Sequence, residues 1–85
     1  MAYMPSPPSS PPPNYVPQQS TYAVDPRGLC NCVEHYTYLW LRNGDNFWFY
    51  LSYIGGSNVL GYRFFGGRWN VYSVDLRDIT SFTCQ

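Results

Sequence analysis

Three cysteines and one histidine are the residues of this sequence with the most distinctive chemistry. Cys30, Cys32 and His35 lie close together in the chain, and Cys84 lies far from them. Thiolates and imidazoles bind zinc, but structural zinc sites usually space paired cysteines as C-x2–4-C, whereas here the spacing is C-x-C. Alternation along an extended strand also points His35 away from the face that carries Cys32. We therefore expect no metal site and no cofactor.

The same cysteines could form disulfides. If the first and last strands of a sheet pair antiparallel, Cys32 at the start of one lies beside Cys84 at the end of the other, within bridging distance. Closing a loop of about 50 residues would stabilise the fold by about 4 kcal/mol in the chain-entropy model. Cys30 would remain outside the sheet, available to bond a second subunit. The alternative is three reduced thiols, the usual state in a cytosolic protein.

No group of residues predicts catalysis. His35 follows Glu34 in the chain, but alternation places their side chains on opposite faces of a strand. Asp75 and Asp78 flank a short turn, where acidic side chains cap backbone N–H groups. The glycines lie in hairpin turns and not in a phosphate-binding loop. We expect that the protein is not an enzyme.

Charge and hydropathy exclude several classes of partner. Five arginines and five acidic residues, with no lysine, give a formal net charge of zero. That balance gives no electrostatic attraction to nucleic acid or to an anionic membrane, and it leaves little repulsion between copies. No apolar run reaches the roughly 20 residues that span a bilayer, and no secretory signal is visible. We expect a protein made in the cytosol that associates with itself.

Proline dominates the N-terminal part of the chain. Residues 1–20 hold seven of the eight prolines, a composition that cannot build a core and that favours extended polyproline II. We predict a disordered or extended arm over residues 1–21, followed by a β domain over residues 22–85. Pro11, Pro12, Pro13 and Tyr15 match the PPxY pattern that aromatic grooves bind, and we expect them to make the arm's contacts. The alternative is a solvated leader without partners.

From Cys30 onward the sequence is rich in aromatic and β-branched residues bounded by turn signals, which is typical of short strands. Asn43-Gly44 predicts a type I′ hairpin turn, and Gly66-Gly67 predicts a second tight hairpin. Residues 75–78 are too few for an α-helix and fit one 3₁₀ turn. The predicted strands cover residues 32–42, 46–54, 59–65, 68–74 and 79–84.

This order of elements is that of the SH3-like small barrels. We therefore predict an all-β fold in which a five-stranded antiparallel meander closes as an SH3-like barrel, since closure removes exposed edges. The alternative is an open antiparallel sheet that is completed in an oligomer.

Aromatic residues are more numerous than one small core can bury. Thirteen of the 17 lie between Tyr36 and Tyr72, and they fall on both faces of the predicted strands. An exposed aromatic patch normally marks an interaction surface, although a tightly curled barrel could use the same rings to fill its ends. The predicted interaction face is Tyr36, Tyr38, Trp40, Trp48 and Tyr50. The predicted core is Leu39, Leu41, Phe47, Phe49, Leu51, Val71 and Ile79.

The stretches "YTYLWL", "FWFY", "GYRFFGGRW" and "DLRDITSFTC" give the chain a resemblance over residues 22–84. The sequence resembles a group of small proteins of spore-forming Firmicutes that carry a proline-rich head and an aromatic β body, some of them labelled "transporter". Cys32 and Cys84 fall where these proteins have cysteines, and Cys30 is additional. The resemblance implies a protein of the mother-cell cytoplasm that is later exposed on the spore or cell surface. It implies no chemistry.

Two functions compete on these observations. The first is a structural, self-assembling protein, an oligomer or fibre, whose aromatic bodies are linked by the arm and by disulfides; its partners are further copies, with other spore-surface proteins or glycan as additional candidates. The second is a monomeric binding module whose Tyr/Trp face stacks on sugar rings or holds a proline-rich peptide.

Overall fold

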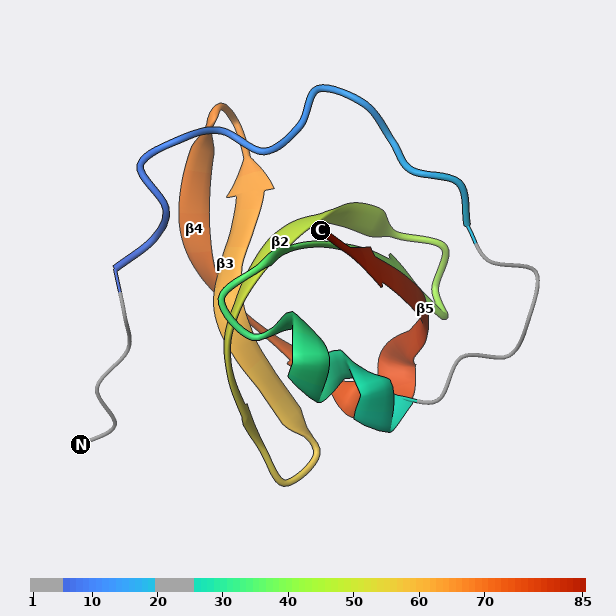
Figure 1. Cartoon of the computed structure of the whole chain (residues 1–85). Helices are drawn as coiled ribbons and strands as arrows, with labels where there is room; N and C mark the ends of the chain where they lie inside the picture. Colours follow the sequence, from blue (N-terminus) through green and yellow to red (C-terminus); the bar gives the residue numbers. More distant parts are fainter. Residues whose placement is uncertain (1–5, 20–25) are drawn as a thin grey trace.

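The computed structural model describes residues 6–19 and 26–85. Within them the chain forms two 3₁₀ segments and five strands, with no α-helix (Figure 1). In chain order these are η1 (Pro26–Cys32), β1 (Tyr36–Leu41), β2 (Asn46–Gly55), β3 (Asn58–Phe65), β4 (Arg68–Asp75), η2 (Leu76–Asp78) and β5 (Ile79–Cys84). The all-β class and the five strands are confirmed. The predicted boundary between residues 21 and 22 lies outside the described residues.

The strands form one antiparallel sheet in the order β4-β3-β2-β1-β5. The first and last strands therefore pair, as predicted, but β4 and β5 stand at opposite edges and do not pair with each other. The sheet is not closed into a barrel, so the prediction of closure is wrong. The structure shows an open antiparallel sheet. The edge at β5 already has a neighbour, because η1 packs against it, and closure is not needed to protect that edge.

The two predicted hairpin turns differ in their outcome. Gly66 and Gly67 both have positive φ angles, 64° and 78°, and join Phe65 directly to Arg68, as a two-residue turn requires. The predicted type I′ turn at Asn43-Gly44 is wrong, because only Gly44 has a positive φ. The Asn43 side chain instead accepts a hydrogen bond from the Asp45 backbone N–H at 2.9 Å, and this local bond favours a longer loop.

The core face of the sheet carries aliphatic and phenylalanine side chains. Leu39, Phe49, Leu51 and Val59 are fully buried there, and Leu29 of η1 covers them from outside the sheet. The prediction of Val71 in the core is wrong, since 68% of its surface is exposed. It pairs with Tyr62 at the free edge of the sheet and lies on the opposite face.

The first strand begins later than predicted. Cys32 ends η1, and Glu34, with a φ of 66°, turns the chain before β1 starts at Tyr36. Cys84 pairs with Thr37 in the sheet, and Cys32 reaches it from η1 to form a disulfide with 5.8 Å between the two Cα atoms. The predicted pairing of the cysteines is therefore confirmed, while Cys30 is exposed and unbonded.

Candidate binding face

The face of the sheet opposite the core carries a continuous layer of rings. Tyr36, Tyr38 and Trp40 alternate along β1, and their neighbours on β2 are Trp48 and Tyr50. The structure thus places all five residues of the predicted interaction face on one side of two paired strands. Two further rings extend the layer toward β4. We call the whole set the aromatic face: Tyr36, Tyr38, Trp40, Trp48, Tyr50, Phe64 and Trp69.

One cluster on this face contains Tyr38, Trp40 and Trp48, which are buried. The Tyr38 ring lies edge-on to Trp48, with 5.1 Å between centroids, and 4.8 Å from Trp40. Its hydroxyl donates a hydrogen bond to Asn46 Oδ1 at 2.6 Å. Burial, and to a smaller extent the charge of Asp45, raises the pKa of Tyr38. The hydroxyl is therefore a neutral donor at neutral pH.

The second cluster joins β1 and β2 to the edge strand β4. Trp69 stacks on Tyr36 at 5.8 Å between centroids and lies edge-on to Phe64 at 5.0 Å. Tyr50 contacts both Tyr36 and Trp69 with its ring. Phe64 and Trp69 were missed as members of this face. The hairpin at Gly66-Gly67 was a sufficient signal, because it pairs Phe64 with Trp69 on one side of the sheet.

Residues 6–19, which we call the proline-rich segment, contain no helix or strand and cross the aromatic face (Figure 1). The carbonyl oxygen of Ser10 accepts two hydrogen bonds near the β4 edge. One comes from the indole Nε1 of Trp69 at 3.0 Å, and the other from the hydroxyl of Tyr36 at 3.3 Å. This end of the segment is therefore held by its backbone.

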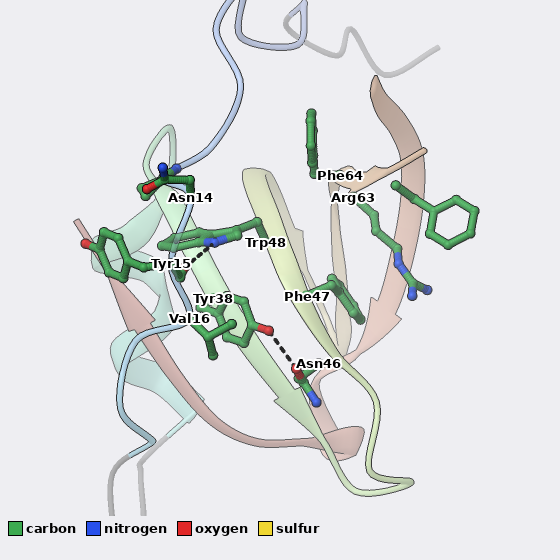
Figure 2. Close-up of a pocket in the computed structure, with 11 residues that line it drawn as sticks. Asn14, Tyr15, Val16, Tyr38, Asn46, Phe47, Trp48, Arg63 and Phe64 are labelled. Carbon is green, nitrogen blue, oxygen red and sulfur yellow. Dashed lines mark hydrogen bonds between the residues drawn. The ribbon is translucent and has the colours of Figure 1, made fainter. Parts of the chain in front are cut away.

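The middle of the segment is held at Tyr15. The Trp48 indole Nε1 donates to the Tyr15 carbonyl oxygen at 3.0 Å, and the two rings meet edge to face at 6.1 Å (Figure 2). The side-chain amide of Gln85 donates to the Tyr15 hydroxyl. Farther along, the Gln19 amide donates to Ser81 Oγ on β5 at 2.9 Å. The segment thus contacts the sheet from β4 to β5.

The prolines between these two anchors are only partly enclosed. Pro12 and Pro13 are half-buried, whereas Pro11 is exposed. The structure therefore places three of the four predicted arm residues, Pro12, Pro13 and Tyr15, against or beside the body. It places Pro11 toward solvent.

A groove of about 480 Å³ remains between the segment and the sheet (Figure 2). Pro13 and Val16 form one wall, and Phe47, Trp48 and Phe64 form the other. Arg63 lines the groove, and its guanidinium lies 4.2 Å from the centre of the Phe47 ring. Its Nη2 is 3.2 Å from Asp45 Oδ2, so the charge of Arg63 is compensated locally. The groove is thus largely apolar and carries little net charge.

The structure places each of the residues with distinctive chemistry. Cys32 and Cys84 are bonded to each other, and His35 lies in the turn before β1, where its Nδ1 contacts the Gln85 carbonyl oxygen. Within residues 6–19 and 26–85, no group of three potential metal ligands is found. Asp75 caps η2 by accepting from the Arg77 backbone N–H at 2.8 Å.

In the described part of the chain, no helix has the length and apolar character needed to cross a bilayer. Comparison of the chain with protein-family models, with curated proteins and with solved structures finds no match. The aromatic face and the segment that crosses it are therefore the candidate functional site.

Proposed function

We propose that this is a structural, self-assembling protein whose aromatic face binds a proline-rich arm, either its own or that of a neighbouring copy. The observation that carries the proposal is a pair of indole donors. Trp69 and Trp48 donate to the carbonyl oxygens of Ser10 and Tyr15, and these two bonds frame the run of three prolines.

This pattern is suited to a proline-rich ligand. Proline has no N–H, and polyproline II makes no internal hydrogen bonds, so the carbonyl oxygens of such a chain need outside donors. Aromatic side chains with a polar edge supply both the donor and an apolar surface for the rings. A proline-rich chain is also largely ordered before it binds, which lowers the entropic cost of binding.

Exchange of the arm between copies requires no new kind of contact. Every bond that holds the segment in its own chain can be made by the same segment of a second chain, which is the basis of domain swapping. Within one chain the arm competes at a high effective concentration, so exchange is favoured only where the protein is concentrated. Exposed Cys30 is available to join neighbouring copies by a disulfide, with two electrons and two protons passing to an oxidant such as oxygen.

The proposal also includes an SH3-like fold class and a location on the spore surface. The strand order, the pairing of β1 with β5 and the position of η2 support an assignment to the SH3-like class, although the sheet itself is open. A spore-surface location depends only on the resemblance of residues 22–84.

The second candidate function is a monomeric module that binds a foreign glycan or proline-rich peptide. The groove beside the segment favours it, because Trp48, Phe47 and Phe64 line a space of about 480 Å³ that the segment does not fill. Displacement of the segment would also uncover Trp69 for a competing ligand.

The indole N–H groups of Trp48 and Trp69 are direct reporters for a test. One full-length sample is labelled with ¹⁵N, and a second carries a spin label at Ser9→Cys with Cys30→Ser. If arms exchange, mixing the two samples broadens both indole resonances, and the broadening increases with concentration. A spectrum that stays unbroadened at millimolar protein would rule out exchange.

A matched substitution tests the binding itself. Replacing Trp48 and Trp69 by Phe removes both donors, and we expect the proline-rich segment to become several-fold more accessible to proteolysis, since each bond contributes about 1 kcal/mol. Trp40→Phe is the control, because Trp40 belongs to the same face and makes no hydrogen bond to the segment in the described structure. Equal proteolysis of the two variants would contradict the role of the donors.

A further inference from the structure

We propose that the free edge of β4 pairs antiparallel with β4 of a second copy and joins two sheets into one. This contact is separate from the arm, because it uses backbone groups at the sheet edge and not the aromatic face. It would add a second link between copies to the one proposed above.

The edge is long and open. β4 spans eight residues, Arg68–Asp75, and pairs only with β3. Its pairing with β3 runs from Arg68 to Asp75 without a bulge. The residues described elsewhere in the chain add no backbone hydrogen bond to it beyond the one that Leu76, the next residue, makes to Ser57. Half of its N–H and C=O groups therefore point outward in a regular row.

The side chains of β4 do nothing to prevent pairing. Natural edge strands are usually protected by charges, proline, bulges or a covering element. Between its two end residues β4 reads "WNVYSV", with no charge and no proline. Asn70, Val71 and Ser73 are exposed even though the proline-rich segment is in place, and Val71 shows 68% of its surface.

The opposite edge differs in each of these respects. β5 is shorter, η1 packs against it, and the Cys32–Cys84 disulfide fixes the end of the strand to η1. Gly28 of η1 lies so close to the Phe82 ring that an added Cβ would be 3.5 Å from it. Protection is thus present at one edge and absent at the other, which identifies β4 as the edge for association.

A second copy is the occupant that fits this strand. A two-fold axis through Val71 places Val71 opposite its own equivalent, and it pairs Asn70 with Tyr72 and Trp69 with Ser73. The only charges, Arg68 and Asp75, stand at opposite ends of the strand, so antiparallel pairing brings unlike ends together. The net charge of zero leaves no overall repulsion between copies.

An edge contact of this size is weak alone. Pairing two eight-residue strands buries less than the roughly 800 Å² per partner of a typical stable interface. We therefore expect a concentration-dependent dimer and not a permanent one.

Crosslinking tests the register. In the full chain with Cys30→Ser, we expect Val71→Cys to form a disulfide-linked dimer on mild oxidation by copper-phenanthroline, because directly opposed Cβ atoms lie about 5 Å apart. Ser73→Cys is the control, since its equivalent in the second copy would be offset by four residues, about 13 Å. A Val71→Cys protein that stays monomeric, or a Ser73→Cys protein that crosslinks equally well, would overturn the proposal.

A charge at the same position tests the energetics. Val71→Lys places two lysines opposite each other, and we expect the dimer dissociation constant from sedimentation to rise about tenfold or more. Tyr53→Lys adds the same charge at another exposed apolar residue, on a strand that is paired on both sides, and should leave the constant unchanged. The indole resonance of Trp48, on β2 between β1 and β3 and away from the β4 edge, should be the same in both variants, so failure here is distinguishable from failure of arm binding. Equal dissociation constants for the two variants would refute β4 pairing.

Discussion

The two faces of the sheet are both rich in rings, but they are covered in different ways. On the core face, Phe49 and Leu51 are sealed by the body itself, with Leu29 of η1 closing the layer and a disulfide holding η1 in place. On the aromatic face, the cover is the proline-rich segment, held at Ser10, Tyr15 and Gln19 by hydrogen bonds to side chains of the sheet.

The difference follows from the kind of side chain on each face. Phenylalanine and leucine have no polar atom and are stabilised by burial alone, so a cover of close-packed side chains suits them. Tyrosine and tryptophan keep a polar edge that needs a partner when it is buried. The carbonyl oxygens of an extended segment supply hydrogen-bond acceptors for those polar edges at intervals. Such a segment can detach without exposing the core. This difference supports the proposal that one face stabilises the fold and the other binds a proline-rich arm.

The largest effect should come from the core face. Phe49 is fully buried, and Phe49→Ala should destabilise the protein by about 3 to 5 kcal/mol, which approaches the whole stability of a small domain. Phe65→Ala is the control, because 68% of Phe65 is exposed, and it should change the urea midpoint only slightly. Similar midpoints for the two variants would mean that the core face does not carry the stability.

The disulfide should have the next largest effect. Replacing Cys32 and Cys84 by Ala removes a crosslink between residues 52 apart in sequence and should lower the free energy of unfolding by about 2 to 4 kcal/mol. Cys30→Ala should leave that free energy unchanged, since Cys30 is exposed and unbonded. The measurement is urea unfolding with and without reductant. If reductant still lowered the urea midpoint of the variant without Cys32 and Cys84, the stabilising disulfide would have to involve other residues.

A smaller effect is expected on the aromatic face. Pro12→Gly with Pro13→Gly makes the unbound segment more flexible and should weaken its binding by about 0.4 to 1 kcal/mol per substitution. We expect greater quenching of tryptophan fluorescence by acrylamide, with no change in the urea midpoint of the body. Pro7→Gly, at an exposed position, should affect neither. A shift of the urea midpoint in the double variant would show that the two faces are not independent.

The smallest effect concerns the turn between β4 and β5. Hydrogen bonds from the Arg77 side chain and backbone lower the pKa of Asp75 to about 2. A carboxylate with a depressed pKa stabilises the folded state at a pH above its ordinary value near 3.8, and this contribution disappears as the pH falls through about 2. In Arg77→Ala, the Asp75 midpoint followed by NMR should move up toward 3.8. If the Asp75 titration midpoint did not change, the lowered pKa would be due only to the backbone N–H of residue 77, which Asp75 caps at the start of η2.

Much of the sheet could be predicted from local patterns. Alternation along residues 36–41 and 46–51 identified both faces, and the paired glycines at 66–67 fixed one hairpin. Pairing of the first and last strands brought the two bonded cysteines together. These features depend on the period of a strand and on the φ angles of glycine, and both can be read directly from a sequence.

Other features depended on contacts that no local pattern contains. The position of the proline-rich segment is set by donors on Trp48 and Trp69, which lie more than 30 residues away from their acceptors. Val71 has an apolar side chain, as a core residue does, but it is exposed on an edge strand. Only the strand order of the sheet determines that position. Closure was predicted from the order of the elements and from the need to protect exposed edges, and neither can show that η1 already covers β5.

The disulfide between Cys32 and Cys84 also determines how the chain would carry tension. If the chain were pulled between the proline-rich segment and Gln85, the disulfide would carry the force directly from Cys84 to Cys32. Residues 33–83, which form β1 to β4 and all of β5 except its last residue, would bear no load. Only the part before Cys32 would extend, by at most about 3.5 Å per residue. Oxidised, the molecule would act as an extensible tether with an unloaded body, and reduction would transfer the force to the hydrogen bonds between β1 and β5.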